Sequence, residues 1–436
     1  MERNIIHLDM DAFFVAVECK RDSRLRGKPL IIGGSSRRGV VAACSYETRQ
    51  YGVHSAMPMY LALQLCPDAK VISGDMEAYS QASHEVTEII SEKAPAFEKA
   101  SIDEFYIDAS GMDRYFGAFR WAKELRQTIL KKSALPISLA MSVNKLVSKV
   151  ATAEFKPNAE AQIPAGTEKD FLAPLAVEKI PMIGKQTASF LHDMGVRTVR
   201  TLRQMPLPFL ISAFGKHGRA LWNKAHGEDP SPVVPYSEQK SISTECTFDS
   251  DTIDVRRLKS VLIAMVEKVT FNLRDQRKLT SCVTVKIRYA NFDTETKQIH
   301  IPYTASDHVL LRVAHGLFDK LYTRRMLIRL VGVRLSGLVH GNYQISLFDD
   351  TAENINLYQS IDHIKHKYGV EKVIRANTID VNKRVRMEMN MFAPKAPAPK
   401  SPTPKSPKGD LASPSGEVGG ANSQKIDVPD LRPEFL

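Results

Sequence analysis

The sequence predicts a multidomain protein of the mixed α+β class. Its 436 residues leave room for several domains, because one domain usually takes about 100–200 residues. Hydrophobic residues make up 43% of the chain and charged residues 25%, the mixture of ordinary globular proteins, which excludes a wholly disordered or fibrous chain. Stretches with the two-residue period of strands and stretches with a helical period both occur, so both kinds of element are expected.

Acidic side chains flank the apolar strands predicted in the first 165 residues. The patterns predict strands at 5–8, 105–107 and 137–143 and a helix at 117–130. Asp9 follows the first strand, and Asp103 and Glu104 precede the second. The expected structure is an α+β layer with carboxylates at the ends of its strands.

Residues 179–205 predict two helices joined through a glycine turn. The run Ile180-Pro181-Met182-Ile183-Gly184-Lys185 precedes a helix-like segment that ends near Gly195. In a helix-hairpin-helix, such a turn presents backbone N–H groups and a helix N-terminus to a DNA phosphate, here from Ile183, Gly184 and Lys185. A tight turn between two packed helices is the alternative interpretation of these residues.

Residues 241–340 have the clearest periodicity. They predict strands at 241–248, 283–289, 299–303 and 328–338 and helices at 258–273 and 309–322, in the order βαββαβ. Two helices on one side leave the other face of a four-stranded sheet free. On the second strand that face carries Lys286 and Arg288, which makes it a suitable platform for a nucleic-acid backbone.

The excess of basic charge is concentrated in this same stretch. The whole chain has 60 Lys and Arg against 49 Asp and Glu, a net charge of +11. Residues 240–340 hold 17 basic and 10 acidic side chains, whereas residues 1–165 hold 21 and 20. A charge that served only solubility would be spread more evenly, so we expect a phosphate-facing region.

Two segments contain too few apolar residues to form a core. Pro230, Pro232 and Pro235 stand among polar residues and predict an extended linker. From residue 393 to Leu436, nine of the 24 prolines occur with a single aromatic residue, which predicts a disordered tail rich in Pro, Lys and Ser.

The cysteines and the N-terminus indicate a reduced, cytoplasmic protein. The five cysteines lie far apart in the sequence, so neither a zinc site nor a disulfide framework is expected (Cys19, Cys44, Cys66, Cys246 and Cys282). Early acidic residues argue against a secretory signal peptide, and no 18-residue apolar run follows them. No membrane association is expected.

Asp9, Asp103 and Glu104 are the candidate catalytic and metal-binding side chains. Carboxylates that converge at strand ends concentrate negative charge, which is tolerable when cations bind there, and hard oxygen ligands suit Mg²⁺. Two such ions ~3.5–4 Å apart would activate an attacking hydroxyl and stabilise a leaving pyrophosphate. Taken singly, each of these residues would serve equally well as a helix cap or a turn residue.

Aromatic and cationic side chains suited to a nucleotide accompany the carboxylates. One ring of the Phe13-Phe14 pair would stack under a sugar and exclude a 2′-hydroxyl by shape, although core packing is the alternative for either ring. Tyr46 and Arg49 stand three residues apart, on one helical face, where both would grip a triphosphate. Lys156, before Pro157, offers a further cation.

Four motifs in order resemble those of the Y-family translesion DNA polymerases, specifically the bacterial DNA polymerase IV type. They are Asp9-Met10-Asp11-Ala12-Phe13-Phe14, Tyr46-Glu47-Thr48-Arg49, Ser101-Ile102-Asp103-Glu104 and Lys156-Pro157-Asn158. The resemblance covers roughly residues 1–348. One position departs from it, because Ala43 stands where the family often has a hydroxyl residue.

The resemblance implies a role for each motif. Two Mg²⁺ would be held by Asp9, Asp103, Glu104 and the Met10 carbonyl. Phe14 would be the steric gate against ribonucleotides, with Phe13 beside it. The incoming triphosphate would be held by Tyr46, Arg49 and Lys156.

The resemblance also implies a right-hand polymerase with palm, small fingers, helical thumb and βαββαβ little finger. The segments are 1–19 and 75–165 for the palm, 20–74 for the fingers, 166–230 for the thumb, 231–240 for the linker and 241–340 for the little finger. Residues 341–392 would follow as a clamp-binding peptide with a helical extension, and 393–436 as the tail.

Gln344-Ile345-Ser346-Leu347-Phe348 resembles the bacterial sliding-clamp binding peptide. In that peptide a Gln and a Leu-Phe pair, here Gln344, Leu347 and Phe348, fill a hydrophobic pocket. About 90 residues follow it, including a helix-like run at 361–368 that could cover the peptide.

The predicted function is template-directed DNA synthesis past damaged bases by a monomer. Its partners would be primer-template DNA, deoxynucleoside triphosphates and the sliding clamp, and the primer 3′-hydroxyl would attack the α-phosphorus. No second carboxylate cluster resembles an exonuclease, so low fidelity without proofreading is expected. The alternatives are a non-catalytic DNA- and clamp-binding adaptor and a polymerase V-type enzyme that needs accessory subunits.

Overall fold

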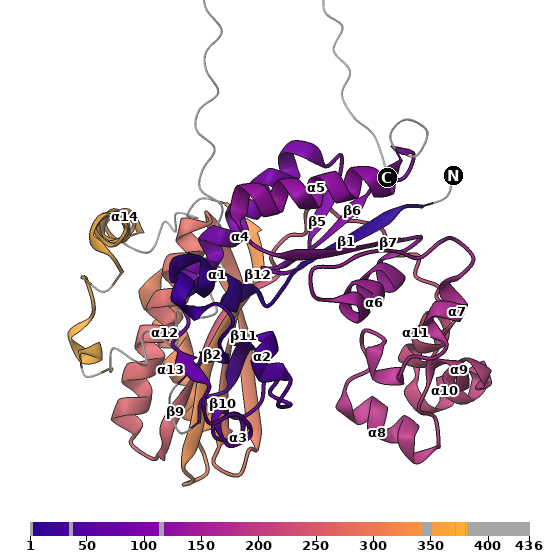
Figure 1. The fold of residues 1–436 in the computed structure, drawn as a ribbon. Coiled ribbons are helices and arrows are strands. Elements are labelled where there is room, and N and C mark those ends of the chain that lie inside the picture. The colour runs from indigo at the N-terminus through magenta and orange to yellow at the C-terminus, as the bar shows by residue number, and fades with distance from the viewer. Residues whose placement is uncertain are drawn as a thin grey trace, which may run out of the picture. The chain divides into compact units, whose positions relative to one another are not determined.

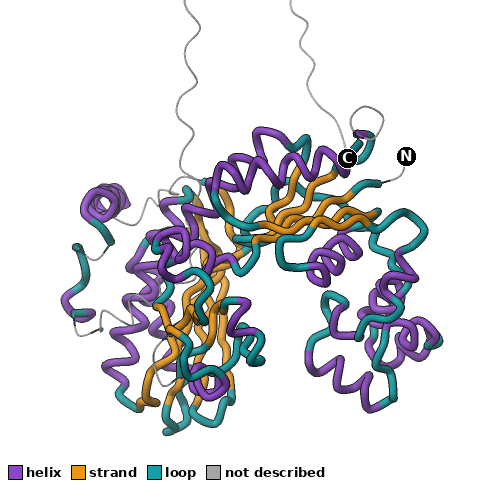
Figure 2. The backbone as a smooth tube through the Cα atoms, viewed as in Figure 1, coloured by secondary structure: helices purple, strands orange, loops and turns teal. Residues whose placement is uncertain are grey.

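The fold is described from a computed structural model of the chain. The structure describes residues 3–34, 38–112, 117–341, 351–370, 372–379 and 381. Helices and strands are interspersed along these residues, as the α+β prediction requires (Figure 2). The expected clamp-binding residues Gln344, Leu347 and Phe348 and the expected tail at 393–436 lie outside the described residues.

The first sheet has five strands in the order β5-β6-β1-β7-β8. They are β1 (Ile5–Met10), β5 (Phe97–Lys99), β6 (Glu104–Asp108), β7 (Ile137–Ser142) and β8 (Glu160–Gln162). The N-terminal strand β1 runs antiparallel between β6 and β7 and is therefore central. Because side chains alternate along a strand, Ile6, Leu8 and Met10 share one face of the sheet, and His7 and Asp9 share the other.

Helices cover both faces of this sheet (Figure 1). The face with Ile6 and Leu8 packs against α1 (Phe13–Arg21), α4 (Met76–Lys93) and α5 (Ala118–Ser133), which contribute buried apolar residues to one core. The helix α6 (Lys145–Phe155) packs on the opposite face, where its Thr152 hydroxyl donates to the His7 carbonyl. The face with His7 and Asp9 therefore faces α6.

A small second sheet has the order β3-β2-β4. Its strands are β2 (Leu30–Gly33), β3 (Val41–Cys44) and β4 (Lys70–Ile72), accompanied by η1 (Ser23–Leu25), α2 (Tyr46–Arg49) and α3 (Met59–Leu65). Ser45 caps the N-terminus of α2, since its hydroxyl accepts from the Thr48 N–H. This cap fixes the start of the turn that carries Tyr46 and Arg49.

The regular elements of residues 168–225 are all helical, and α8 and α9 lie within 179–205, where the glycine-turn pattern predicts helices. The elements are α7 (Glu168–Leu172), η3 (Val177–Lys179), α8 (Lys185–Asp193), α9 (Val199–Gln204), α10 (Leu207–Phe214) and α11 (Lys216–Ala225). Where α10 and α11 meet, a Cβ on Gly218 would lie 2.0 Å from the Leu210 carbonyl oxygen, so this contact requires glycine.

Residues 241–340 form a four-stranded sheet with two helices, which confirms the predicted βαββαβ order. The elements are β9 (Ser241–Thr252), α12 (Val255–Asp275), β10 (Lys278–Tyr289), β11 (Thr294–Thr304), α13 (Asp307–Leu321) and β12 (Ile328–His340), and the strand order is β11-β10-β12-β9. Val283, Val285 and Ile287 of β10 are buried in the core with both helices, so Lys286 and Arg288 lie on the other face, as predicted.

A further helix, α14 (Thr351–Tyr368), contains the helix predicted at 361–368 and begins ten residues earlier. The buried Tyr358 hydroxyl lies 2.6 Å from the His308 Nδ1 atom of α13. Arg274 of α12 donates to the carboxylates of both Asp307 and Asp362. A short turn, η4 (Ala376–Thr378), follows, and Val381 joins the core of the preceding domain. This extension is thus part of that domain's fold.

One local expectation needs correction. The first strand extends to Met10 instead of ending at Leu8, because Asp9 and Met10 continue to pair with Ser138 and Ile137. Phe13 and Phe14 begin the helix α1. No helix among the described residues is both long and apolar enough to cross a membrane.

Candidate active site

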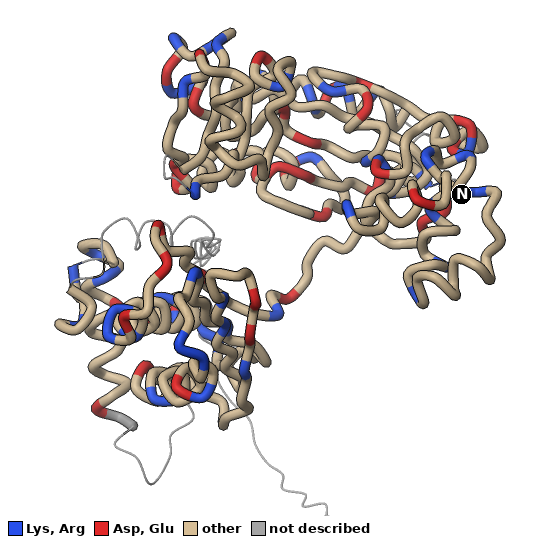
Figure 3. The backbone as a smooth tube through the Cα atoms, turned by 90° about the horizontal axis from the view of Figure 1, so that it is seen from below, with Lys and Arg blue, Asp and Glu red and all other residues tan. Residues whose placement is uncertain are grey.

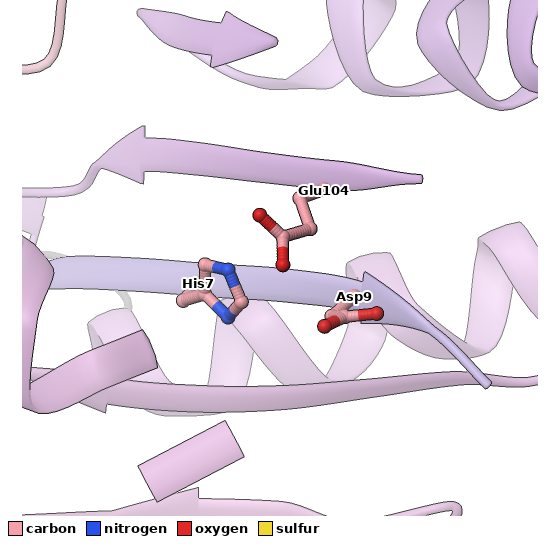
Figure 4. Close-up of side chains that lie close together, drawn as sticks. All are labelled: His7, Asp9 and Glu104. Carbon is pink, nitrogen blue, oxygen red and sulfur yellow. The ribbon is translucent and has the colours of Figure 1, made fainter. Parts of the chain in front are cut away.

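Asp9 and Glu104 lie directly opposite each other on neighbouring strands. The register of β1 and β6 pairs Asp9 with Glu104 and His7 with Tyr106, so these side chains share one face of the sheet. One ligand atom each from His7, Asp9 and Glu104 lies within 4.8 Å of the others (Figure 4). Strand pairing therefore joins two carboxylates that are far apart in the sequence.

Asp103 lies at the corner just before β6. Its backbone carbonyl accepts from the Met10 N–H at 3.1 Å, which places this corner beside the end of β1. Its carboxylate accepts from the Ser101 hydroxyl at 2.6 Å, and that hydroxyl in turn accepts from the Glu104 N–H at 3.0 Å. The structure thus brings the three predicted carboxylates to one edge of the sheet, with the Asp103 side chain held by Ser101.

Two lysines neutralise the paired carboxylates. Lys149 of α6 donates to both Glu104 oxygens at 2.6 and 2.5 Å. Lys156 forms an ion pair with Asp9 and donates to the Met10 carbonyl at 3.2 Å. Burial raises the pKa of Asp9 to about 6, in part opposed by Lys156 and reinforced by Glu104 and Asp103. This edge therefore attracts cations, and its own lysines supply the charge in this structure.

His7 is fully buried beside these carboxylates. Its ring lies 4.7 Å from the Tyr106 ring, centroid to centroid, and neither ring nitrogen has a hydrogen-bond partner among the described residues. Burial, followed by the charges of Lys149, Lys156 and Lys145, lowers its pKa well below the usual value. The imidazole is therefore neutral at physiological pH.

Asp11 holds the turn that carries Lys156. Its buried carboxylate accepts from the Ser138 hydroxyl at 2.9 Å and from the Asn158 N–H at 2.8 Å. Arg126 of α5 donates to the Asn158 side chain and, at 2.8 Å, to Glu160. These bonds fix the chain that follows Pro157, and Lys156, just before Pro157, pairs with Asp9.

Phe14 is supported from below by a buried tyrosine. The rings of Phe14 and Tyr79 are stacked, with centroids 4.3 Å apart and planes 11° apart. The Tyr79 hydroxyl donates to Glu18 at 2.7 Å, which fixes the tyrosine. Phe14 is partly exposed, whereas Phe13 is buried in the core. Of the two predicted rings, only Phe14 is thus free to meet a sugar.

Tyr46 and Arg49 form one unit on α2. The Arg49 guanidinium lies 4.6 Å from the centre of the Tyr46 ring. Burial, with the negative charge of Asp11, raises the pKa of Tyr46 to about 12, so its hydroxyl keeps its proton. That hydroxyl is buried and has no hydrogen-bond partner among the described residues. A buried donor without an acceptor fits an anionic ligand such as a phosphate.

The glycine turn at 183–185 presents a helix N-terminus. Gly184 precedes α8 without a side-chain cap, so its first N–H groups are available to a ligand. Ile183 is buried, and its N–H donates to the Ile180 carbonyl at 3.1 Å. Among the three predicted contacts, Gly184 and Lys185 are therefore the ones placed to meet a phosphate.

The free face of the second large sheet carries charges of both signs. Lys286 donates to Glu245 at 2.9 and 3.0 Å. The two residues lie on strands separated by β12, and the glycine between them, Gly332, leaves the space for the pair, since a Cβ there would lie 2.8 Å from Glu245. Acidic and basic positions are interspersed throughout the described chain (Figure 3). Arg288 donates to the Thr294 hydroxyl at 2.8 Å.

Sequence reasoning missed the residues that support this site. His7 lies two residues before Asp9 on β1, so both side chains point to the same face of the sheet. This two-residue spacing was a signal that could have identified His7. Lys149 and Tyr79 have no local motif, since each becomes relevant only through a helix packed on a strand or on another helix. Asp11 was visible within the first motif, but its role as the anchor of a distant turn depends on the tertiary structure.

Comparison with known proteins covers most of the chain. Residues 8–153 match the impB/mucB/samB family, residues 239–347 match its C-terminal domain, and residues 178–229 match the "DNA polymerase-iota, thumb domain" family. The chain is 37% identical over 383 residues to DNA polymerase IV of Dehalococcoides mccartyi, covering 86% of this chain and 97% of that one. It is also 37% identical to DNA polymerase IV of Listeria monocytogenes, over 77% of this chain and 95% of the relative.

A solved structure agrees with these matches. A "Y-family DNA polymerase chimera" superposes with a TM-score of 0.69 at 26% identity, over 78% of this chain and all of the chimera. Together the family matches cover a catalytic core, a thumb and a C-terminal domain. The chain therefore belongs to the Y family (impB/mucB/samB) of DNA polymerases and is a translesion DNA polymerase of the DNA polymerase IV type.

Proposed function

We propose that Asp9, Asp103 and Glu104 are the catalytic carboxylates of this polymerase, and that with the Met10 carbonyl they bind two Mg²⁺. All four donors are hard oxygens, which suits Mg²⁺, and the two lysine pairs demonstrate the demand for positive charge at this edge. Ions held by these residues would supply the activation of the primer hydroxyl and the offset of negative charge on the triphosphate. The opposed pair Asp9 and Glu104 is the observation that carries this proposal.

We propose that Tyr46, Arg49 and Lys156 bind the triphosphate of the incoming nucleotide. The orphaned Tyr46 hydroxyl would donate to a phosphate oxygen, and the Arg49 guanidinium beside it would pair with the same anion. Lys156 sits at the Asp9 carboxylate and would turn toward the triphosphate as cations replace it there. Phe14, stacked on Tyr79, would be the steric gate, with Phe13 behind it in the core.

DNA would be held at two further places. The N–H groups at Gly184 and Lys185 would bind a backbone phosphate, with Ile183 anchoring the turn in the core. Lys286 and Arg288 would bind phosphates across the free sheet face. On the sequence motif, Gln344, Leu347 and Phe348 would bind the sliding clamp. We infer a monomer that works in the cytoplasm, where DNA and deoxynucleoside triphosphates are found.

Primer extension tests the carboxylate assignment. Asp103→Ala and Glu104→Ala should each lower the rate of extension with Mg²⁺ by about 10²-fold or more, because each removes a ligand of cations that offset charge in the transition state. DNA affinity should stay within about 2-fold, since phosphate contacts elsewhere supply it. Glu124→Ala, an exposed residue of α5, is the matched control.

The outcome separates this function from the alternatives. Extension at the wild-type rate by Glu104→Ala would reject the assignment and favour a DNA-binding adaptor. Dependence on added subunits for any extension would favour the polymerase V type. The same assay on templates with minor-groove adducts, with and without clamp, tests damage bypass and clamp binding.

A further inference from the structure

An imidazole lies within the group of carboxylates that the polymerase reaction requires. His7 is fully buried, and neither of its ring nitrogens has a hydrogen-bond partner among the described residues. Buried polar atoms are normally paired, so an unpaired imidazole needs an explanation. The contact with the Tyr106 ring explains why the ring is buried, but it gives the ring nitrogens no hydrogen-bond partner.

The geometry around His7 is that of a ligand set. His7 and Asp9 are two residues apart on β1 and share a face with Glu104, the residue opposite Asp9. One atom from each lies within 4.8 Å of the others, and in Figure 4 the ring lies beside both carboxylates. Ligands of a tetrahedral ion with bonds of 2.0–2.1 Å lie about 3.3 Å apart, so binding an ion would require these side chains to move closer together.

The donor chemistry differs from that of a pure carboxylate site. Mg²⁺ prefers oxygen ligands, whereas an imidazole nitrogen favours Zn²⁺ and other first-row transition metals. We propose that His7, Asp9 and Glu104 form a transition-metal site that binds Zn²⁺ in preference to Mg²⁺. Because this site shares Asp9 and Glu104 with the proposed Mg²⁺ site, Zn²⁺ bound there excludes Mg²⁺ and inhibits synthesis. The inference rests on the proposed roles of those two carboxylates.

Zn²⁺ and Mg²⁺ binding to the full-length, chelator-treated protein, measured by calorimetry without DNA, tests the site. His7→Phe keeps a ring beside Tyr106 but removes the nitrogens, and it should lower the ratio of Zn²⁺ to Mg²⁺ affinity at least ~10-fold. His192→Gln is the matched control, since His192 also lies close to a carboxylate, 2.9 Å from Glu178, but on the surface. An unchanged ratio in folded His7→Phe would overturn the proposal.

A second measurement detects the bound nitrogen directly. Mn²⁺ bound by an imidazole gives a nitrogen coupling in pulsed electron paramagnetic resonance, and histidine labelled with ¹⁵N changes that coupling. The wild-type protein should show the histidine coupling with one equivalent of Mn²⁺, and His7→Gln should lose it. No histidine coupling in the wild type, or the same coupling in His7→Gln, would reject His7 as a ligand.

Asp103→Asn separates this inference from the proposed function. Asp103 lies outside the group of three ligands, so the variant should lose Mg²⁺-dependent extension and keep Zn²⁺ binding within about 3-fold. If Asp103→Asn extends primers normally, the proposed catalytic set fails, whatever its Zn²⁺ affinity. If the variant is inactive and its Zn²⁺ affinity falls as well, the proposal of a Zn²⁺ site made of His7, Asp9 and Glu104 fails.

Discussion

Phe14, the proposed steric gate, is supported by the residue beneath it. Its ring is stacked on Tyr79, and Tyr79 is fixed by Glu18. A gate must resist being pushed aside by a 2′-hydroxyl, and a stacked, buried support supplies that resistance. Phe13, the preceding residue, is buried in the core.

Replacing Phe14 by Ala should therefore raise the ratio of ribo- to deoxynucleotide insertion by roughly 10-fold or more, since the discrimination depends on shape. Steady-state insertion of each nucleotide opposite the same template base measures the ratio. Tyr79→Leu should raise it by a smaller factor, because the Phe14 ring remains but loses its support. A ratio unchanged in Phe14→Ala would reject the gate.

Asp9, one of the proposed catalytic carboxylates, is destabilised by its burial. Its pKa is raised to about 6, from an ordinary value of 3.8. The folded protein therefore binds more protons than the unfolded chain between these values, and the free energy of unfolding falls as pH rises from about 4 to 6. Above pH 6 the charged carboxylate makes its full unfavourable contribution.

Asp9→Asn should remove this contribution in chelator-treated protein. At pH 7.5 the variant should be more stable than the wild type by up to about 3 kcal/mol, and the difference should shrink toward pH 4. Urea unfolding across this pH range measures it. A variant that is less stable at pH 7.5 would show that the Lys156 pair outweighs the burial of Asp9.

At the scale of elements, buried ion pairs attach the extension α14 to the helices α12 and α13. The side chain of Arg274 is 5% exposed and bridges Asp307 and Asp362, which are 6% and 16% exposed. A buried cation between two anions is stabilising only while the set is complete, because each remaining carboxylate would be left without a partner.

Arg274→Met should thus destabilise the protein by about 3–5 kcal/mol and release α14 to protease. Calorimetric melting and limited proteolysis measure the two effects. Lys259→Met on the same helix is the control, since its pair with the half-exposed Asp319 should contribute less than about 1 kcal/mol. Equal effects of the two substitutions would contradict the account.

Elements were more predictable than contacts. The βαββαβ order followed from alternation in β10 and from the four-and-three spacing in α12, because both patterns are local. The pairing of Asp9 with Glu104 was not derivable from local pattern, since it depends on the register of strands separated by most of the domain; the family motifs supplied it. Neither the local patterns nor the family motifs identified Lys149, Tyr79 and Arg126, because their roles come from helix packing.

At the scale of the whole molecule, the charges proposed for DNA binding and those proposed for chemistry lie in different domains. The sheet-face residues Lys286 and Arg288 belong to a domain with its own core, separate from that of the carboxylates. In addition, Lys286 is paired with Glu245, so a phosphate must compete with that carboxylate.

Lys286→Gln with Arg288→Gln should weaken duplex binding and lower the slope of log affinity against log salt by about 1–2. Glu245→Gln should strengthen binding, since Lys286 is then free to meet phosphate. Fluorescence anisotropy at several salt concentrations measures both, and extension at saturating DNA should change little. A weaker Glu245→Gln complex would show that Glu245 orients Lys286 for DNA.

The lysines at the carboxylate edge have one more consequence. Because Lys149 and Lys156 already neutralise Glu104 and Asp9, the chain can fold and persist while divalent ions are scarce. Loading of divalent ions would then be an exchange of one kind of cation for another, and the ammonium of Lys156 would be free to meet the phosphates of an arriving nucleotide. Before its substrates bind, the enzyme would thus keep its carboxylates paired with its own lysines.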